Sequence, residues 1–181
     1  MTYAVETEPG IQSIVYRLTN EPWHSRPPRS GKRAVLYVAH LSSDSELREE
    51  PLIREVIESE PDAAFYLRWQ VTTLPGTAVP ARFTSHMATT ISTPSTALAL
   101  DRPYLGQKTF DVLRVLNWMT SVGHTEVHLI GLGWGALSAT FAASLHDAVV
   151  QVTLKNSLTS YAGSRKANTT TGHWQLCYPM S

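Results

Sequence analysis

The sequence predicts one α/β domain, in which helices cover both faces of a mostly parallel sheet. The chain has 181 residues, of which 43% are hydrophobic, so it can bury a core of its own. Short continuous apolar runs alternate with segments of helical periodicity. Strands that alternate with helices of this size favour parallel pairing, with five or six strands expected here.

Buried strands are predicted where apolar residues run without interruption. Residues 34–39 (AVLYVA) are the clearest case, whereas residues 11–19 alternate polar and apolar positions. Prolines and glycines make residues 21–32 a connecting loop. The strands are expected at residues 11–19, 34–39, 63–69, 126–130 and 148–154.

Helices are predicted between these strands. The strongest covers residues 105–122, and Gly123 supplies its stop signal. Its apolar stripe is expected to consist of Phe110, Leu113, Val115, Leu116 and Met119. Further helices are expected at residues 52–59 and 134–145.

Charge and composition exclude several classes of partner. Fifteen basic and fifteen acidic residues cancel, so no basic face points to nucleic acid or to an anionic membrane. No apolar stretch approaches the roughly 20 residues of a membrane helix, and the first residues are not a secretory leader, which predicts a cytoplasmic protein. The lone Cys177 is interpreted as incidental. No cofactor and no metal are expected, and the oligomeric state is not predicted.

The segment Gly131–Gly135 (GLGWG) lies between a predicted strand and a predicted helix, which is the setting of a nucleophile elbow, G-x-S-x-G. Gly133 then takes the nucleophile position and brings no nucleophile. The backbone N–H groups of Trp134 and Leu41 would be the oxyanion donors. His40, directly after a predicted strand, is the best candidate for a pocket residue.

Two other interpretations of this segment stay open. Gly131, Gly133 and Ala136 fit the relaxed dinucleotide fingerprint, but residues 151–156 lack the acid that holds the ribose, and Trp134 would crowd the pyrophosphate. The segment can also be a tight turn without chemistry.

A serine-type triad is not predicted. After Gly133 the acids and histidines are Asp147, His146 and His173. Asp147 and His146 are expected at the end of the helix remote from the elbow, and Ser138 and Ser144 inside that helix. The chain as written is therefore not expected to hydrolyse esters by the usual covalent route.

Four segments resemble the acetyl xylan esterase and dienelactone-hydrolase-like group of α/β-hydrolases: YAVETEPGIQSIVYRL, RAVLYVAHLSSDSELREEPLIREVI, LDRPYLGQKTFDVLRVLNWM and VHLIGLGWGALSATFAASLHDAVVQVTLKNSLTSY. The similarity covers roughly residues 2–69 and 100–161. It implies a three-layer α/β-hydrolase-type sheet, incomplete at the C-terminus, within residues 1–161. It also implies that catalytic relatives remove acetyl groups from carbohydrate esters. The acid and the histidine of the catalytic triad of such relatives have no counterpart in this chain. The apolar strand at residues 148–154 would then be an aggregation-prone edge.

Residues 70–100 and 162–181 lack both the periodicity and the resemblance. One set of codons permitted for residues 86–97 encodes YGNDYFYAIHG when the reading frame is shifted by two bases. The same shift applied to permitted codons for residues 167–181 gives EHYHWPLAAMLPNV. Both peptides resemble the missing family segments. Residues 70–100 and 162–181 are either an irregular insert and an irregular tail or, as our hypothesis, two stretches translated out of frame. The coding DNA tests this hypothesis.

Overall fold

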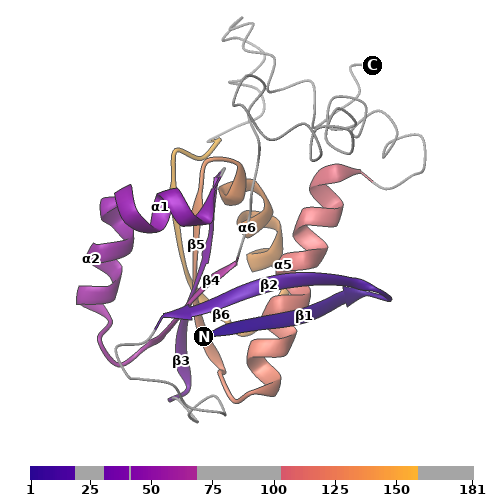
Figure 1. Ribbon diagram of the computed structural model, residues 1–181, viewed down its shortest axis with the longest axis horizontal. Helices are drawn as coiled ribbons and strands as arrows, with labels where there is room; N and C mark the ends of the chain where they lie inside the picture. The colour runs from indigo at the N-terminus through magenta and orange to yellow at the C-terminus, as the bar shows by residue number, and fades with distance from the viewer. Residues whose placement is uncertain (19–30, 41, 69–102, 159–181) are drawn as a thin grey trace, which may run out of the picture.

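The computed structural model describes residues 1–18, 31–40, 42–68 and 103–158. These residues form a six-stranded sheet with the strand order β1-β2-β4-β3-β5-β6 (Figure 1). The strands are β1 (Thr2–Glu8), β2 (Ile11–Leu18), β3 (Arg33–Val38), β4 (Ala64–Arg68), β5 (Glu126–Leu132) and β6 (Val149–Lys155). The helices are α1 (Ser43–Glu49), α2 (Pro51–Ser59), α5 (Tyr104–Ser121) and α6 (Trp134–Leu145).

The sheet is mostly parallel, as predicted. The central strand β3 pairs in parallel with β4 and β5, and β5 pairs in parallel with β6. The hairpin β1–β2 adds two antiparallel pairings at one edge. Because β3, β4, β5 and β6 all point the same way, their carboxyl ends meet at one edge of the sheet.

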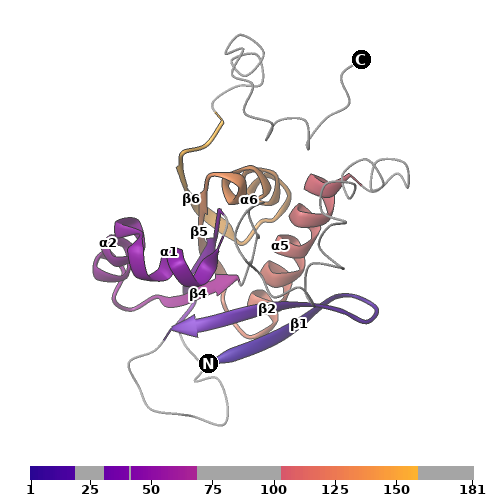
Figure 2. The ribbon, with the colours of Figure 1, turned by 45° about the horizontal axis from the view of Figure 1, so that its top comes forward.

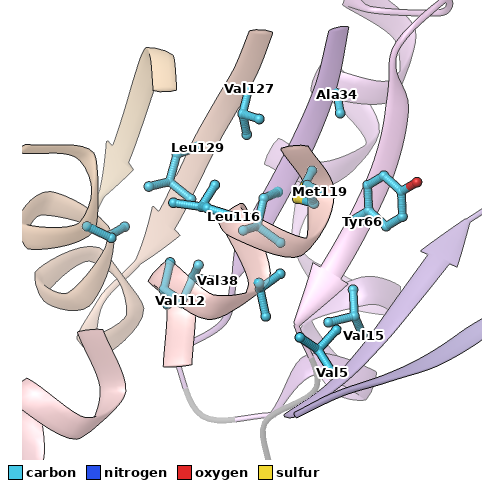
Figure 3. Close-up of a cluster of buried hydrophobic side chains, with 14 of the residues drawn as sticks. Val5, Val15, Ala34, Val38, Tyr66, Val112, Leu116, Met119, Val127 and Leu129 are labelled. Carbon is cyan, nitrogen blue, oxygen red and sulfur yellow. The ribbon is translucent and has the colours of Figure 1, made fainter. Parts of the chain in front are cut away.

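Three layers result, with α1 and α2 on one face of the sheet and α5 and α6 on the other (Figures 1 and 2). Alternate residues of each strand enter alternate cores. Figure 3 shows the core under α5, where Val112, Leu116 and Met119 pack on the sheet. The opposite core packs Ile53 and Val56 of α2 on the other face of the same strands.

The structure corrects the predicted elements in three places. Strand β1 was not predicted, although the Pro9-Gly10 pair marks its hairpin turn, where Gly10 has a φ of +78°. Helix α1 was also not predicted; it carries Asp44 and Glu46 in its first turn and Arg48 in its last, which suits the helix dipole. Phe110, assigned to the apolar stripe of α5, is 42% exposed, and Val112 is buried instead.

The predictions for residues 21–30, 70–100 and 162–181 lie outside the described residues.

Candidate functional site

The Gly131–Gly135 segment forms a sharp turn between β5 and α6, with Gly133 at its tip. Gly133 has φ 52° and ψ −112°, a conformation that a residue with a Cβ adopts only under strain. A strained residue on a strand-to-helix turn at the carboxyl end of a parallel sheet is the geometry of a nucleophile elbow. The sharp strand-to-helix turn predicted from sequence is therefore present, with Gly133 in its strained position.

The two outer glycines allow the helix to approach the sheet closely. A Cβ on Gly131 would lie 2.6 Å from the Cα of Ala136 and 2.9 Å from the Cβ of Ala139. A Cβ on Gly135 would lie 2.5 Å from the carbonyl oxygen of Ala39, at the end of β3. Packing thus explains Gly131 and Gly135 without any chemistry.

The imidazole of His40 lies where a side chain at position 133 would begin. A Cβ on Gly133 would contact His40 Nδ1 and lie 2.7 Å from His40 Cγ. The backbone N–H of Trp134 donates to His40 Nδ1 at 2.9 Å. The Trp134 amide, one of the two predicted oxyanion donors, is thus engaged by the imidazole, while Leu41, the other, lies outside the described residues.

A carboxylate on α1 holds the backbone of His40 in place. The two oxygens of Glu46 accept from the His40 N–H, both at 3.0 Å, and one also accepts from the Ser42 N–H at 3.3 Å. The Tyr37 hydroxyl donates to the same carboxylate at 2.8 Å. Burial and this carboxylate raise the pKa of the Tyr37 phenol well above its ordinary value. The phenol therefore stays a neutral donor. Through Glu46, the backbone that carries the His40 imidazole is tied to Tyr37 of β3.

The far side of the elbow rests on β6. The Gly133 N–H donates to the Lys155 carbonyl at 2.9 Å. The Lys155 ammonium pairs with Glu50 Oε1 at 2.5 Å, and this hydrogen bond lowers the pKa of the Glu50 carboxyl. Two backbone amides that a bound phosphate would use, those of Gly133 and Trp134, therefore have protein acceptors.

The described residues bring no serine-type triad to the elbow. Ser138 is buried and donates to the Gly135 carbonyl at 3.1 Å. His146 and Asp147 follow the last residue of α6, about 18 Å along the helix from the elbow by the rise of its 12 residues. His146 instead lies 3.3 Å from Asn117 Oδ1. His173 lies outside the described residues.

Sequence reasoning missed a group on the α2 side of the sheet that consists of an acid, a buried histidine and a hydroxyl. His128 Nδ1 lies 2.5 Å from Glu60 Oε1, and His128 Nε2 lies 2.8 Å from Thr153 Oγ1. The signal was His128 within the apolar strand VHLI, because a buried imidazole requires hydrogen-bond partners. Its partners come from distant segments, so the sequence did not identify them.

His124 lies near the sheet but does not belong to the group of Glu60, His128 and Thr153. His124 lies 2.9 Å from the Tyr66 hydroxyl and 3.0 Å from the Gly31 carbonyl. In the part of the chain that the structure describes, no three His, Cys, Asp or Glu side chains could together hold a metal ion. No described helix is both long and apolar enough to cross a membrane.

Comparison with solved structures gives the fold. An esterase from Pyrococcus furiosus matches with a TM-score of 0.53 at 12% identity, over 84% of this chain and 49% of the esterase. An epoxide hydrolase from Mycobacterium thermoresistibile matches with a TM-score of 0.49 at 18% identity, over 92% of this chain and 44% of the hydrolase. The chain spans about half the length of these proteins. No family model and no curated protein matches the sequence. The described chain has an α/β-hydrolase fold.

Proposed function

We propose that the chain is an α/β-hydrolase-type domain related to carboxylic-ester hydrolases of the acetyl xylan esterase-like group. We further propose that this chain does not hydrolyse esters at its elbow. One observation carries the proposal: the imidazole of His40 occupies the space of a nucleophile at Gly133 and accepts the Trp134 N–H. Without a nucleophile and with that donor engaged, attack and oxyanion stabilisation both fail at this turn.

The ligand class follows from the relationship. We expect a small-molecule or carbohydrate ester as the substrate of catalytic relatives. The alternative, a nucleotide- or small-ligand-binding domain that uses the Gly131–Gly135 loop, gains no support from the amides of Gly133 and Trp134, which have protein acceptors. NAD and ATP are therefore expected to leave the melting temperature unchanged.

Ester turnover and covalent labelling test the proposal in a Thr153→Val background, which removes the hydroxyl next to His128. The protein is incubated with p-nitrophenyl acetate and, separately, with a fluorophosphonate probe, and labelled peptides are identified by mass spectrometry. We expect no label on His40 or on residues 131–135, and the same background hydrolysis after His40→Ala. Turnover that His40→Ala abolishes, or a label at the elbow, would refute the proposal.

A further inference from the structure

A second constellation with catalytic geometry lies away from the elbow. Glu60 ends α2, His128 lies near the start of β5, and Thr153 lies on β6. The Glu60 carboxylate contacts His128 Nδ1 at 2.5 Å, and His128 Nε2 contacts the Thr153 hydroxyl at 2.8 Å. In enzymes with a nucleophilic hydroxyl, an acid orients an imidazole, and the imidazole takes the proton of the hydroxyl. The three side chains here are arranged in this order.

The negative charge of Glu60 determines where His128 carries its proton and which nitrogen can accept the proton of Thr153. Burial alone would raise the pKa of Glu60, but hydrogen bonds from Arg33 and His128 outweigh it, and the pKa lies below its ordinary value. Arg33 Nε donates to the second oxygen of Glu60 at 2.5 Å. With Glu60 ionised, a neutral His128 carries its proton on Nδ1 toward the carboxylate. Its Nε2 is then the acceptor for the Thr153 hydroxyl proton.

A nucleophile must be accessible to its substrate, whereas the imidazole that activates it can be buried. His128 is 3% exposed, whereas Thr153 is partly exposed on β6. Gln151, Thr153 and Lys155 share one face of this strand, and the Lys155 ammonium pairs with Glu50. Arg33 reaches the same face by donating to Gln151 Oε1 at 2.8 Å. On this face, Gln151 before Thr153 contacts a cationic group and Lys155 after it carries one, and each of these cations is paired with a carboxylate.

We propose that Glu60, His128 and Thr153 form an acyl-accepting site for activated carboxylic esters, with Thr153 as the nucleophile. Thr153 Oγ1 attacks the carbonyl carbon while His128 Nε2 takes the hydroxyl proton. The bond to the leaving alcohol then breaks, His128 returns the proton to that alcohol, and an acyl ester remains on Thr153. This inference is independent of the function proposed for the elbow.

Site-resolved acetylation of the full chain tests the proposal. After brief exposure to p-nitrophenyl acetate, peptide mapping is expected to find an acetyl group on Thr153. The Thr153→Ser variant is expected to keep the modification at position 153, and Thr153→Val to lose it. Glu60→Gln and His128→Asn are expected to reduce the rate at least tenfold in protein whose circular dichroism is unchanged.

Thr140 is the matched control, because it is an exposed threonine whose hydroxyl donates to the Ala136 carbonyl at 2.8 Å. Thr140 is expected to stay unmodified, and Thr140→Val to leave acetylation of Thr153 unchanged. No acetyl group on Thr153, or equal acetylation of Thr140 and Thr153, would overturn the proposal. The comparison of Thr140 with Thr153 uses the unmodified chain, so it decides even where Glu60→Gln or His128→Asn does not fold.

Discussion

Gly133 is the residue at which backbone conformation and side-chain space are both restrictive. Its φ of 52° disfavours any side chain, and a Cβ there would overlap the His40 imidazole. Only the second restriction acts against the serine of an active elbow, because such a serine also occupies a strained turn. The position of the His40 side chain is thus matched to a glycine at position 133.

Gly133→Ser is expected to lower the free energy of unfolding by about 1–3 kcal/mol, because it adds backbone strain and a contact with His40. Urea denaturation measures the change. Gly133→Ser combined with His40→Ala relieves the contact but not the strain, so the double variant is expected to recover part of the loss. A single variant as stable as the native protein would contradict this description of the turn.

His124 is expected to make stability depend on pH. Burial lowers its pKa below the ordinary 6.5, so the unfolded chain binds the proton more readily than the folded one. Its stabilising contribution is therefore present above about pH 6.5 and is lost as the pH falls. His146, whose pKa burial also lowers, adds in the same direction.

Urea denaturation between about pH 5 and 7 checks this dependence. His124→Gln is expected to make the decline in stability on acidification shallower than in the native chain, with His146→Asn as the comparison for the second histidine. A native-like decline in His124→Gln would show that His124 does not couple to folding.

Helix α6 is positioned by the close approach of its first turn to the end of β3. Gly135→Ala is expected to cost about 3 kcal/mol, because the new Cβ would meet the backbone carbonyl oxygens of Val38 and Ala39, which cannot move aside alone. Gly106→Ala in α5 is the control, since its Cβ would meet nothing within 4 Å. That substitution is expected to be neutral or stabilising by up to about 1 kcal/mol. Equal effects of the two substitutions on urea denaturation would refute this packing.

Strand β6 is the last strand in the order of the described sheet, and three of its apolar side chains are solvent-exposed. Val150, Val152 and Leu154 are 56%, 41% and 39% exposed. We expect self-association that increases with protein concentration, and Val152→Lys should reduce it by placing a charge on this strand. Sedimentation velocity over a concentration series measures the effect. Unchanged association in Val152→Lys would locate the contact elsewhere.

At the scale of the whole molecule, local patterns predicted most of the sheet. The run AVLYVA and the helical periodicity of residues 105–122 are local signals, and they became a buried strand and a helix with one buried face. The turn at Gly133 was equally local, since its glycines follow a strand directly. Helix α1 was missed because its seven residues contain only one large apolar side chain, Leu47.

The contacts that define the sites were not predictable in this way. His40 and Trp134 are 94 positions apart, and Glu60 and His128 are 68 positions apart. Only the parallel register of β3 and β5 brings the first pair together. An imidazole inside a fold requires hydrogen-bond partners, but the sheet topology decides which partners His40 and His128 have.

The protonation of His40 tests the central claim most directly. Since the Trp134 N–H donates to His40 Nδ1, the neutral imidazole must carry its proton on Nε2. Nitrogen-15 NMR of histidine-labelled protein at neutral pH, with His40→Ala to assign the signal, is expected to show Nδ1 unprotonated. The Trp134 amide is expected to exchange slowly with solvent and to exchange faster in His40→Ala. A proton on His40 Nδ1, or a Trp134 amide that exchanges equally fast in both proteins, would contradict an elbow occupied by His40.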